Sequence, residues 1–373
     1  MPTDIYDPRE VVNFSAWPAM LPYECLKELQ ENLLNFKNTF CSILEVSHRS
    51  KEYMELNTET QDLFREVLNI PGNYRILFAH GGASTQFANI AANFQGKQWY
   101  VITGDFSERA YKEAQKVSES FVWKREVYEI ASGKESNFSQ IPSLEIISEW
   151  IQKDSTYVHI TDNNTLFGST LFQLPETDVP IIADMTSSLL SREIDVSKYG
   201  MIYAGFQKNI APAGTAVVII RDDLYEKLEE KLPAMYSYKT LVDIDSLYNT
   251  PSTFNVYFSN LVIKWIKQLW WLEVVEKLSR TKSELLYDIV DRSNGFYNNA
   301  IHENNRSITN VVFTLGDWGL EEKFLEEASE HWLVSLKGHK KVGGIRASIY
   351  ISMSYEHVKR LANFMEKFQK ENS

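Results

Sequence analysis

Short apolar runs alternate with helix-like stretches through the middle of the sequence, and this alternation restricts the fold more than any other feature. The runs occupy residues 74–79, 100–103, 121–127, 157–161, 179–183, 201–204 and 216–220. Continuous apolar runs of this kind are typical of strands buried on both faces, and the stretches between them can hold crossover helices. The pattern therefore predicts an α/β fold in which a mixed, mostly parallel sheet is flanked by helices.

Two further regions frame this alternation. Apolar residues at helical spacing over 23–40 and 57–68 predict two helices before the first strand. After residue 253 the pattern predicts one long helix through 286, a strand at 311–315, a helix at 321–331, a strand at 347–351 and a final helix from 355. We therefore expect residues 1–260 to form an N-terminal segment and a large domain, and residues 261–373 to form a smaller α+β domain.

Composition limits the classes of function. The 373 residues are 44% hydrophobic, which allows a large core, and the net charge of -12 disfavours nucleic acid as the main partner. The two cysteines, Cys25 and Cys41, have no metal-site spacing, which predicts no metal and a reducing compartment. No run approaches the roughly 18 apolar residues of a membrane span, and residues 1–7 do not resemble an export signal. We expect a cytoplasmic protein.

One lysine and one aspartate stand where two of the predicted strands end. Lys208 follows the run 201–206, and Asp184 follows the run 179–183. A lysine amine at a buried strand end loses hydration, which disfavours its ammonium form and prepares it to form a Schiff base with an aldehyde. A nearby carboxylate can keep a pyridine nitrogen protonated, so the pair predicts a pyridoxal phosphate site. Taken alone, such a pair is more often a structural ion pair at two strand ends.

A glycine turn precedes one predicted helix. Residues 80–86, with the sequence HGGASTQ, follow the run 74–79 and lead into a helix-like stretch. Glycine lets the backbone approach an anion closely, and the free N–H groups of a helix start attract phosphate. Such a turn is common without any ligand. Beside Asp184 and Lys208 it predicts a cradle for the cofactor phosphate.

Several segments together resemble the phosphoserine aminotransferase family. They are NFSA at 13–16, ADMTSSLLSR at 183–192, YAGFQKNIAPAG at 203–214 and GGIRASIY at 343–350. The resemblance implies a fold-type I pyridoxal phosphate transferase that assembles as a homodimer with shared active sites. It also implies amino transfer between O-phospho-L-serine and 2-oxoglutarate, giving 3-phosphohydroxypyruvate and glutamate in serine biosynthesis. Phosphohydroxythreonine, in vitamin B6 synthesis, is a related substrate that the resemblance allows.

The resemblance assigns residues to the cofactor. Lys208 and Asp184 are the catalytic pair, and Thr165 would donate its hydroxyl to the phenolic oxygen of the cofactor. Phe106 stands where the family commonly has a tryptophan that stacks on the pyridine, so an apolar face remains without an indole N–H. The phosphate contacts would come from Ala83, Ser84, Ser187 and Gln207, and from Asn249 and Thr250 of the neighbouring subunit.

The resemblance also assigns residues to the substrate. A phosphate and an α-carboxylate need separate positive anchors, and a guanidinium suits the carboxylate because it binds in a bidentate manner. Arg346 would bind the α-carboxylate. His339 and Lys340, with His48 and Arg49 from the partner subunit, would surround the phosphate or the distal carboxylate of glutamate. Lys340 replaces an arginine that is common in the family, which exchanges a planar fork for a point charge.

Some of the nine tryptophans occupy positions where the resembling family typically has glycine. These are Trp17, Trp270, Trp271 and Trp332. The largest side chain at a position built for the smallest should cost stability. Our hypothesis is that the source organism uses UGA codons for glycine and that they are read here as tryptophan. The alternative is a divergent enzyme in which Trp17 narrows the site.

Two other functions are compatible with these residues. The first is another member of the same enzyme class, such as a desulfurase or an alanine–glyoxylate aminotransferase. A desulfurase needs a mobile nucleophilic cysteine, whereas Cys25 and Cys41 both precede the cofactor motifs. The second is a degenerate cofactor-binding protein without catalysis, which the unusual Trp17, Trp270 and Lys340 would favour and the intact Asp184 and Lys208 disfavour.

Overall fold

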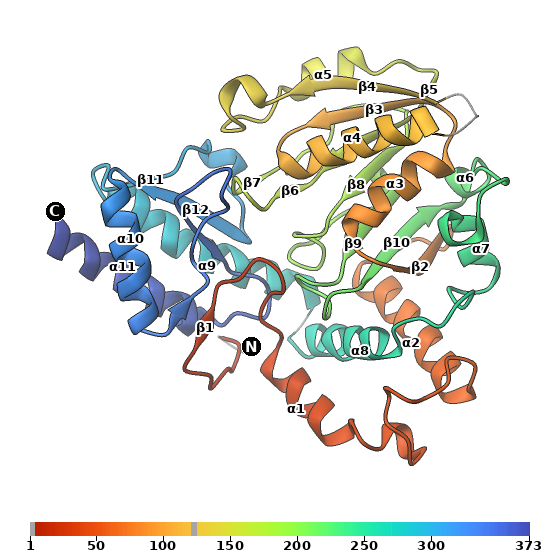
Figure 1. Ribbon diagram of the computed structural model, residues 1–373, viewed down its shortest axis with the longest axis horizontal. Coiled ribbons are helices and arrows are strands. Elements are labelled where there is room, and N and C mark those ends of the chain that lie inside the picture. The colour runs from red at the N-terminus through yellow and green to blue at the C-terminus, as the bar shows by residue number, and fades with distance from the viewer. Residues whose placement is uncertain (1–3, 121–124, 270) are drawn as a thin grey trace.

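A computed structural model describes residues 4–120, 125–269 and 271–373, and a seven-stranded sheet lies at its centre (Figure 1). The strand order is β2-β10-β9-β8-β5-β3-β4. Among the described strands of this sheet, β10 alone runs opposite to the others, so the sheet is mixed and mostly parallel, as the sequence predicts. The strands are β2 (Tyr74–His80), β3 (Gly96–Ile102), β4 (Arg125–Ser132), β5 (Ser155–Thr161), β8 (Ile181–Asp184), β9 (Met201–Gly205) and β10 (Thr215–Arg221).

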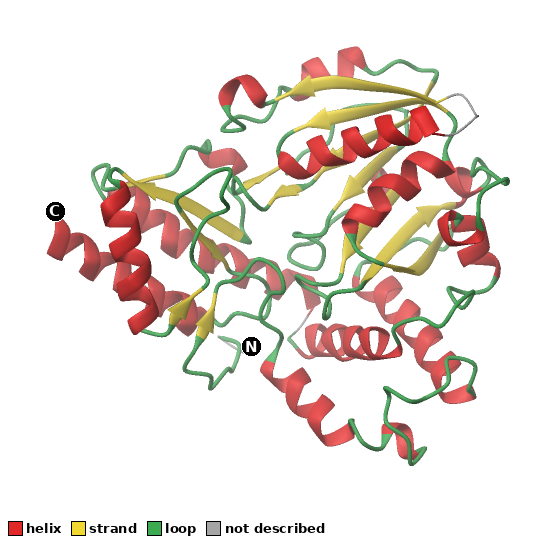
Figure 2. Ribbon diagram, in the orientation of Figure 1, coloured by secondary structure: helices red, strands yellow, loops and turns green. Residues whose placement is uncertain are grey.

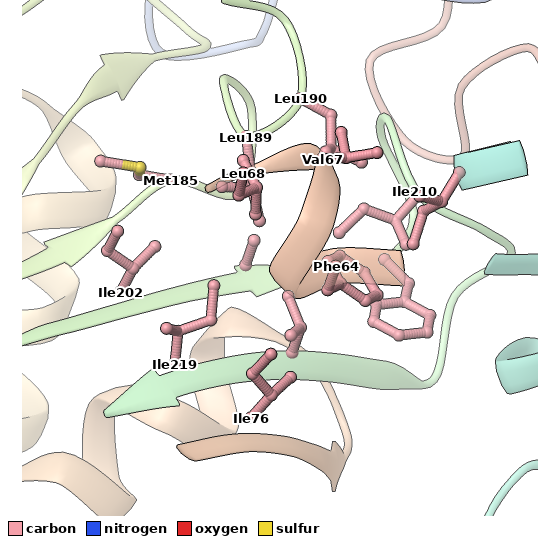
Figure 3. Close-up of a cluster of buried hydrophobic side chains, with 14 of the residues drawn as sticks. Phe64, Val67, Leu68, Ile76, Met185, Leu189, Leu190, Ile202, Ile210 and Ile219 are labelled. Atoms are coloured by element: carbon pink, nitrogen blue, oxygen red, sulfur yellow. The ribbon is translucent and has the colours of Figure 1, made fainter. Parts of the chain in front are cut away.

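Helices cover both faces of this sheet, as Figure 2 shows. Successive residues of β2 face opposite sides of the sheet. Leu77 packs in one buried cluster with Phe87, whereas Ile76 packs in another with Phe64. Figure 3 shows the second cluster, where Phe64 and its neighbours lie against Ile76 and the adjacent strands. The helices of this part are α1 (Tyr23–Asn32), α2 (Lys51–Val67), α3 (Ala83–Asn93), α4 (Asp105–Ser120), α5 (Leu144–Trp150), α6 (Asp222–Tyr225), α7 (Tyr238–Asp243) and α8 (Thr253–Gln268).

The C-terminal part is smaller and combines helices with short strands. It contains α9 (Trp271–Arg292), β11 (Tyr297–Asn298), β12 (Asn310–Leu315), α10 (Trp318–Glu330), β13 (Leu333–Val334), β14 (Ile345–Ser348) and α11 (Tyr355–Asn372). The N-terminal strand β1 (Val12–Asn13) pairs with β13, and Val12 and Phe14 are buried in the core of this part. A small hairpin of β6 (Asn163–Asn164) and β7 (Ser169–Thr170) stands beside the main sheet. The division at residue 260 stays a prediction.

Three predicted helices have different ends in the structure. The helix predicted over 23–40 stops at Asn32, and it does not resume because Asn35 is non-helical, with φ -146° and ψ 74°, and Lys37 and Phe40 have positive φ. The helix predicted over 57–68 begins earlier, at Lys51, where Ser50 accepts a hydrogen bond from the backbone N–H of Tyr53. The long helix predicted from 253 to 286 is two helices, α8 and α9.

Two of the sequence predictions fall partly or wholly on residues that the structure does not describe. Part of the strand predicted over 121–127 lies outside the described residues, and β4 begins at Arg125. Two of the tryptophans in question, Trp271 and Trp332, have φ values of 70° and 62°. Trp270 lies outside the described residues. Among the helices that the structure describes, none combines the length and apolarity needed to cross a membrane.

Candidate active site

A cavity of about 600 Å³ opens at the carboxyl ends of the parallel strands. This edge of an open α/β sheet is the usual place for a ligand, because the loops that follow several strands converge there. Nine of the residues predicted to bind cofactor or substrate line the cavity. They are Ala83, Ser84, Phe106, Thr165, Asp184, Ser187, Gln207, Lys208 and His339.

Lys208 lies three residues beyond β9, and its side chain is buried. Its amine donates a short hydrogen bond to the hydroxyl of Thr165, its one hydrogen-bond partner among the described residues. Burial lowers the pKa of Lys208 from 10.5 to about 7, an effect that Asp184 opposes and Arg346 reinforces. A large fraction of the amine is therefore neutral and nucleophilic near neutral pH.

Asp184 is the last residue of β8, is buried and lines the cavity. Its Oδ1 accepts a hydrogen bond of 2.9 Å from the backbone N–H of Thr186. Burial raises the pKa of this carboxyl, and the hydrogen bonds from Thr186 together with the charge of Lys208 lower it in part. The carboxylate is thus placed to stabilise a positive charge in the cavity.

The start of α3 has the form of an anion site. Gly82 occupies the N-cap without a capping side chain, and in the described chain the first α3 amides with a backbone acceptor are those of Thr85 and Gln86. The amides of Ala83 and Ser84 therefore remain available at a helix N-terminus that lines the cavity. Gly81 has φ +87°, and a Cβ there would lie 2.2 Å from the hydroxyl oxygen of Thr85, so only glycine fits.

Polar and aromatic side chains complete the wall of the cavity. Ser187 accepts a hydrogen bond of 2.8 Å from the side-chain amide of Asn163 and donates one of 3.0 Å to its carbonyl oxygen. The Phe106 ring lies with its centre 5.5 Å from the amine of Lys208. These contacts hold one hydroxyl in the wall of the cavity and one apolar face beside the reactive amine.

Arg346, from β14, has two buried donor atoms without a hydrogen-bond partner among the described residues. The residue is only 7% exposed, and the two atoms are Nε and Nη1. Burial lowers the pKa of this guanidinium. Buried charged donors left unpaired are costly, and a carboxylate is the partner whose geometry they fit. Its nearest described ring is the indole of Trp17, 4.7 Å from Cζ.

Comparison with known proteins gives the family of this chain. The family described as Aminotransferase class-V matches residues 11–361. This chain belongs to that family. The phosphoserine aminotransferase of Geobacillus kaustophilus is 43% identical over 365 residues, which cover 97% of this chain and 99% of that one. The phosphoserine aminotransferase of Lactococcus lactis subsp. cremoris is 42% identical over 367 residues, with 97% and 100% covered.

Solved structures of aminotransferases also match. Phosphoserine aminotransferase from Bacillus circulans subsp. alkalophilus has a TM-score of 0.92 and 40% identity, over 98% of this chain and 100% of that one. The PLP-bound phosphoserine aminotransferase from Trichomonas vaginalis has a TM-score of 0.89 and 34% identity, over 95% and 99%. An alanine–glyoxylate aminotransferase from Nostoc sp., at 15% identity and a TM-score of 0.76, shows the shared fold alone. The fold-type I architecture is therefore confirmed.

Six predicted binding residues are not among those that line the cavity. His48 and Arg49 precede α2, Asn249 and Thr250 precede α8, Lys340 is exposed on the loop before β14, and Arg346 lies against the indole of Trp17, which lines the cavity. The first four are those that the resemblance assigns to a neighbouring subunit. His48 Nε2 and Asn249 Oδ1 are buried without a hydrogen-bond partner in the described part of the chain. Their place in an active site stays a prediction.

The cavity also contains a cation that the motifs of this aminotransferase family did not indicate. Arg109, on α4, lines the cavity and lies with Cζ 5.4 Å from the Phe106 ring centre. Its Nε is 2.7 Å from Asp105, which also pairs with Lys341. The i,i+4 spacing of Asp105 and Arg109 was the available signal, but it is a common surface pattern that does not reveal a cavity.

Proposed function

We propose that this chain transfers the amino group of O-phospho-L-serine to 2-oxoglutarate, giving 3-phosphohydroxypyruvate and glutamate. The observation that carries the proposal is that the amine of Lys208, whose pKa burial lowers to about 7, and the unpaired guanidinium donors of Arg346 lie beside the same ring, that of Trp17, which lines the cavity. An amino acid presents an amine and a carboxylate on one carbon, so its recognition needs such a pair. The names and coverage of the relatives support the phosphorylated substrate.

The residues at the cavity fit pyridoxal phosphate as the cofactor. The free amides of Ala83 and Ser84 suit its phosphate, Asp184 suits its pyridine nitrogen, and Phe106 suits the face of its ring. Ser187, Gln207 and Thr165 would add hydrogen bonds. When bound, the cofactor supplies an electron sink for the carbanion formed at the substrate α-carbon.

The chain itself supplies binding and proton transfer. Arg346 holds the α-carboxylate and thereby orients the α-carbon toward Lys208. Lys208, with a pKa of about 7, can accept the α-proton and return it as general base and then general acid. His339, which lines the cavity, would contact the phosphate or the distal carboxylate, with Lys340 nearby on the same loop. Two substrates then use one site in turn.

The functional unit we propose is a homodimer. The segment around α1 and α2 exposes large apolar side chains, Leu34 at 81%, Phe40 at 89% and Leu44 at 62%. His48 and Arg49 follow these residues, and His48 Nε2 is buried without a partner in the described chain. A second copy would cover the apolar surface and bring His48, Arg49, Asn249 and Thr250 to its neighbour. Light scattering should give twice the chain mass, and a monomer at assay concentration would contradict the proposal.

The remaining assignments follow from the same activity. We propose a role in serine biosynthesis, with phosphohydroxythreonine of vitamin B6 synthesis as a second substrate, and with neither nucleic acid nor membrane as a partner. Cys25 and Cys41 are both free thiols, which supports a reducing compartment such as the cytoplasm. Neither cysteine lines the cavity, which disfavours desulfurase chemistry.

The test is a coupled assay of glutamate formation from O-phospho-L-serine and 2-oxoglutarate with cofactor-loaded protein. Activity that Lys208→Ala abolishes supports the proposal. Full activity in Lys208→Ala would remove its basis. Alanine with glyoxylate is the matched substrate pair for the alternative within the same class. Turnover of alanine and glyoxylate in place of phosphoserine and 2-oxoglutarate would replace our assignment.

A further inference from the structure

The indole of Trp17 occupies the space next to both groups that must contact the substrate. Its ring centre lies 4.7 Å from Cζ of Arg346 and 5.7 Å from Nζ of Lys208. The ring also meets Phe106 edge-on at 6.1 Å and His339 at 6.4 Å. One side chain thus contacts four residues of the site described above.

This placement conflicts with binding of a carboxylate to Arg346. The guanidinium stacks on the indole, and cation–π attraction favours this pair when the cation is desolvated. An indole face has no acceptor for N–H groups, so Nε and Nη1 stay without a partner among the described residues. A carboxylate that reached both Arg346 and the region of Lys208 would have to displace the ring. Trp17 is 38% exposed, so no tight packing prevents its removal.

We propose that residue 17 controls the access of a carboxylate to Arg346, and that tryptophan at this position weakens the binding of the substrate. The inference rests on the proposed function for the identity of the substrate. The access of a dicarboxylate to the guanidinium of Arg346 can be measured by binding, without any turnover. The effect comes from the bulk of the indole, because Trp17 is not among the residues with positive φ. Alanine and glycine at position 17 should therefore act alike.

The experiment measures binding and kinetics in the cofactor-loaded enzyme. In Trp17→Gly and Trp17→Ala, calorimetry should show the Kd of 2-oxoglutarate falling about 10- to 100-fold, the range for one charge-assisted pair. The KM of O-phospho-L-serine should fall in the same range, with a smaller change in kcat. Trp150→Gly, which alters an exposed tryptophan on α5, is the matched control and should change neither.

A second pair of variants ties the gain to Arg346. In an Arg346→Ala background, Trp17→Gly should give no improvement in the Kd of 2-oxoglutarate. An improvement that persists there, or an equal Kd with tryptophan and glycine at position 17, overturns the inference. Tighter binding without amino transfer in any variant would support the inference and count against the proposed function. Equal and efficient amino transfer in the parent, Trp17→Gly and Trp17→Ala would count against the inference and support the proposed function.

A different observation concerns Trp271 and Trp332. Both have left-handed backbone, with φ of 70° and 62°, and both side chains are substantially exposed, at 40% and 55%. Trp332 directly follows His331, the C-cap of α10, and its N–H donates to the carbonyl of Ser329. That position after a helix is the one at which glycine is most favoured, because a Cβ is strained there. Phe40 and Phe138 also have positive φ, so the test must compare residues at each site.

We infer that positions 271 and 332 carry glycine in the protein as its source makes it. The family resemblance implies glycine at position 17 as well, and a UGA codon read as tryptophan would explain all three positions. The source gene should then have UGA at 17, 271 and 332. It should have UGG at Trp265, which is buried inside α8 and needs its bulk. UGG at all four positions would overturn the inference.

A second test of this inference compares the melting temperatures of variants at positions 271 and 332. Trp332→Gly and Trp271→Gly should each raise the melting temperature by a few degrees, because glycine relieves the left-handed strain. The alanine variants at the same positions should raise it less, since alanine keeps the Cβ. Trp150→Gly, in a helix, should lower it or leave it unchanged. Glycine no better than alanine at 271 and 332 would contradict the backbone argument.

Discussion

Burying the amine of Lys208 should destabilise the cofactor-free protein, and Lys208→Met should recover that stability. Methionine has a similar length, is uncharged and accepts burial. The amine has one hydrogen-bond partner among the described residues, the hydroxyl of Thr165, so little is lost on replacement. We therefore expect a catalytically dead variant that is more stable than its parent, as is common for groups kept for function.

The magnitude follows from the pKa of Lys208. The pKa is about 7 in the folded chain against an ordinary 10.5, and this difference corresponds to about 5 kcal/mol. The side chain is only 4% exposed, so solvent screening does not reduce the figure much. Below pH 10.5 the unfolded chain holds the proton more tightly, so stability falls as the pH decreases from 10.5 to about 7 and then levels off.

The assay compares thermal unfolding of parent and Lys208→Met, without cofactor, across pH 7 to 9.5. The advantage of the variant should grow by about 2 kcal/mol between pH 9 and pH 7. Lys282 is also buried with a pKa lowered to about 7, but both proteins retain it, so its effect cancels in the difference. The same comparison of Lys208 and Lys208→Met in an Asp184→Asn background measures the effect of burial on the amine without the nearby carboxylate, which opposes the lowering of the pKa of Lys208. A difference that does not change with pH would refute the burial argument.

Three further predictions concern the site. Asp184→Asn keeps the shape of the residue without its charge; the cofactor should still bind, and kcat should fall about 100- to 1,000-fold in the coupled assay. Arg346→Ala, made in a Trp17→Gly background, should raise the KM of both substrates about 10- to 100-fold, and unchanged values would refute its carboxylate role. Gly81→Ala puts a Cβ 2.2 Å from the Thr85 hydroxyl oxygen and strains a φ of +87°, so the protein should lose cofactor on dialysis, as measured by absorbance. Cofactor retention equal to that of the parent would show that the turn tolerates the methyl group.

The strands could be predicted because burial on both faces leaves a direct mark in the sequence. Residues 201–204 and 216–220 are apolar throughout, and the structure places β9 and β10 over almost the same residues. Helix ends were harder, because periodicity describes the buried face of a helix and not its terminus. The helix predicted to continue to residue 40 stops at Asn32, and Leu34, which fits the apolar pattern, is 81% exposed.

The site could be predicted where function requires a residue at a strand end or a helix start. Lys208, Asp184 and the turn at Gly81 were identified this way, and all three line one cavity. Arg346 was identified only by resemblance, because a lone arginine in a strand has no periodic signal. Arg109 was missed, since its place in the cavity depends on how the start of α4, which carries both Phe106 and Arg109, lies relative to the other walls of the cavity, and no local pattern encodes this.

Burial alone does not distinguish a reactive lysine from a structural one, as Lys208 and Lys282 illustrate. Both are almost fully buried, and burial lowers the pKa of each to about 7. The Lys282 amine donates hydrogen bonds to two backbone carbonyls, that of Tyr350 at 2.9 Å and that of Met353 at 2.8 Å. These two bonds tie α9 to the segment that follows β14. The Lys208 amine faces the cavity with one hydroxyl partner in the described structure. A lowered pKa makes an amine nucleophilic, but it can react only where its lone pair meets open space beside an anion site.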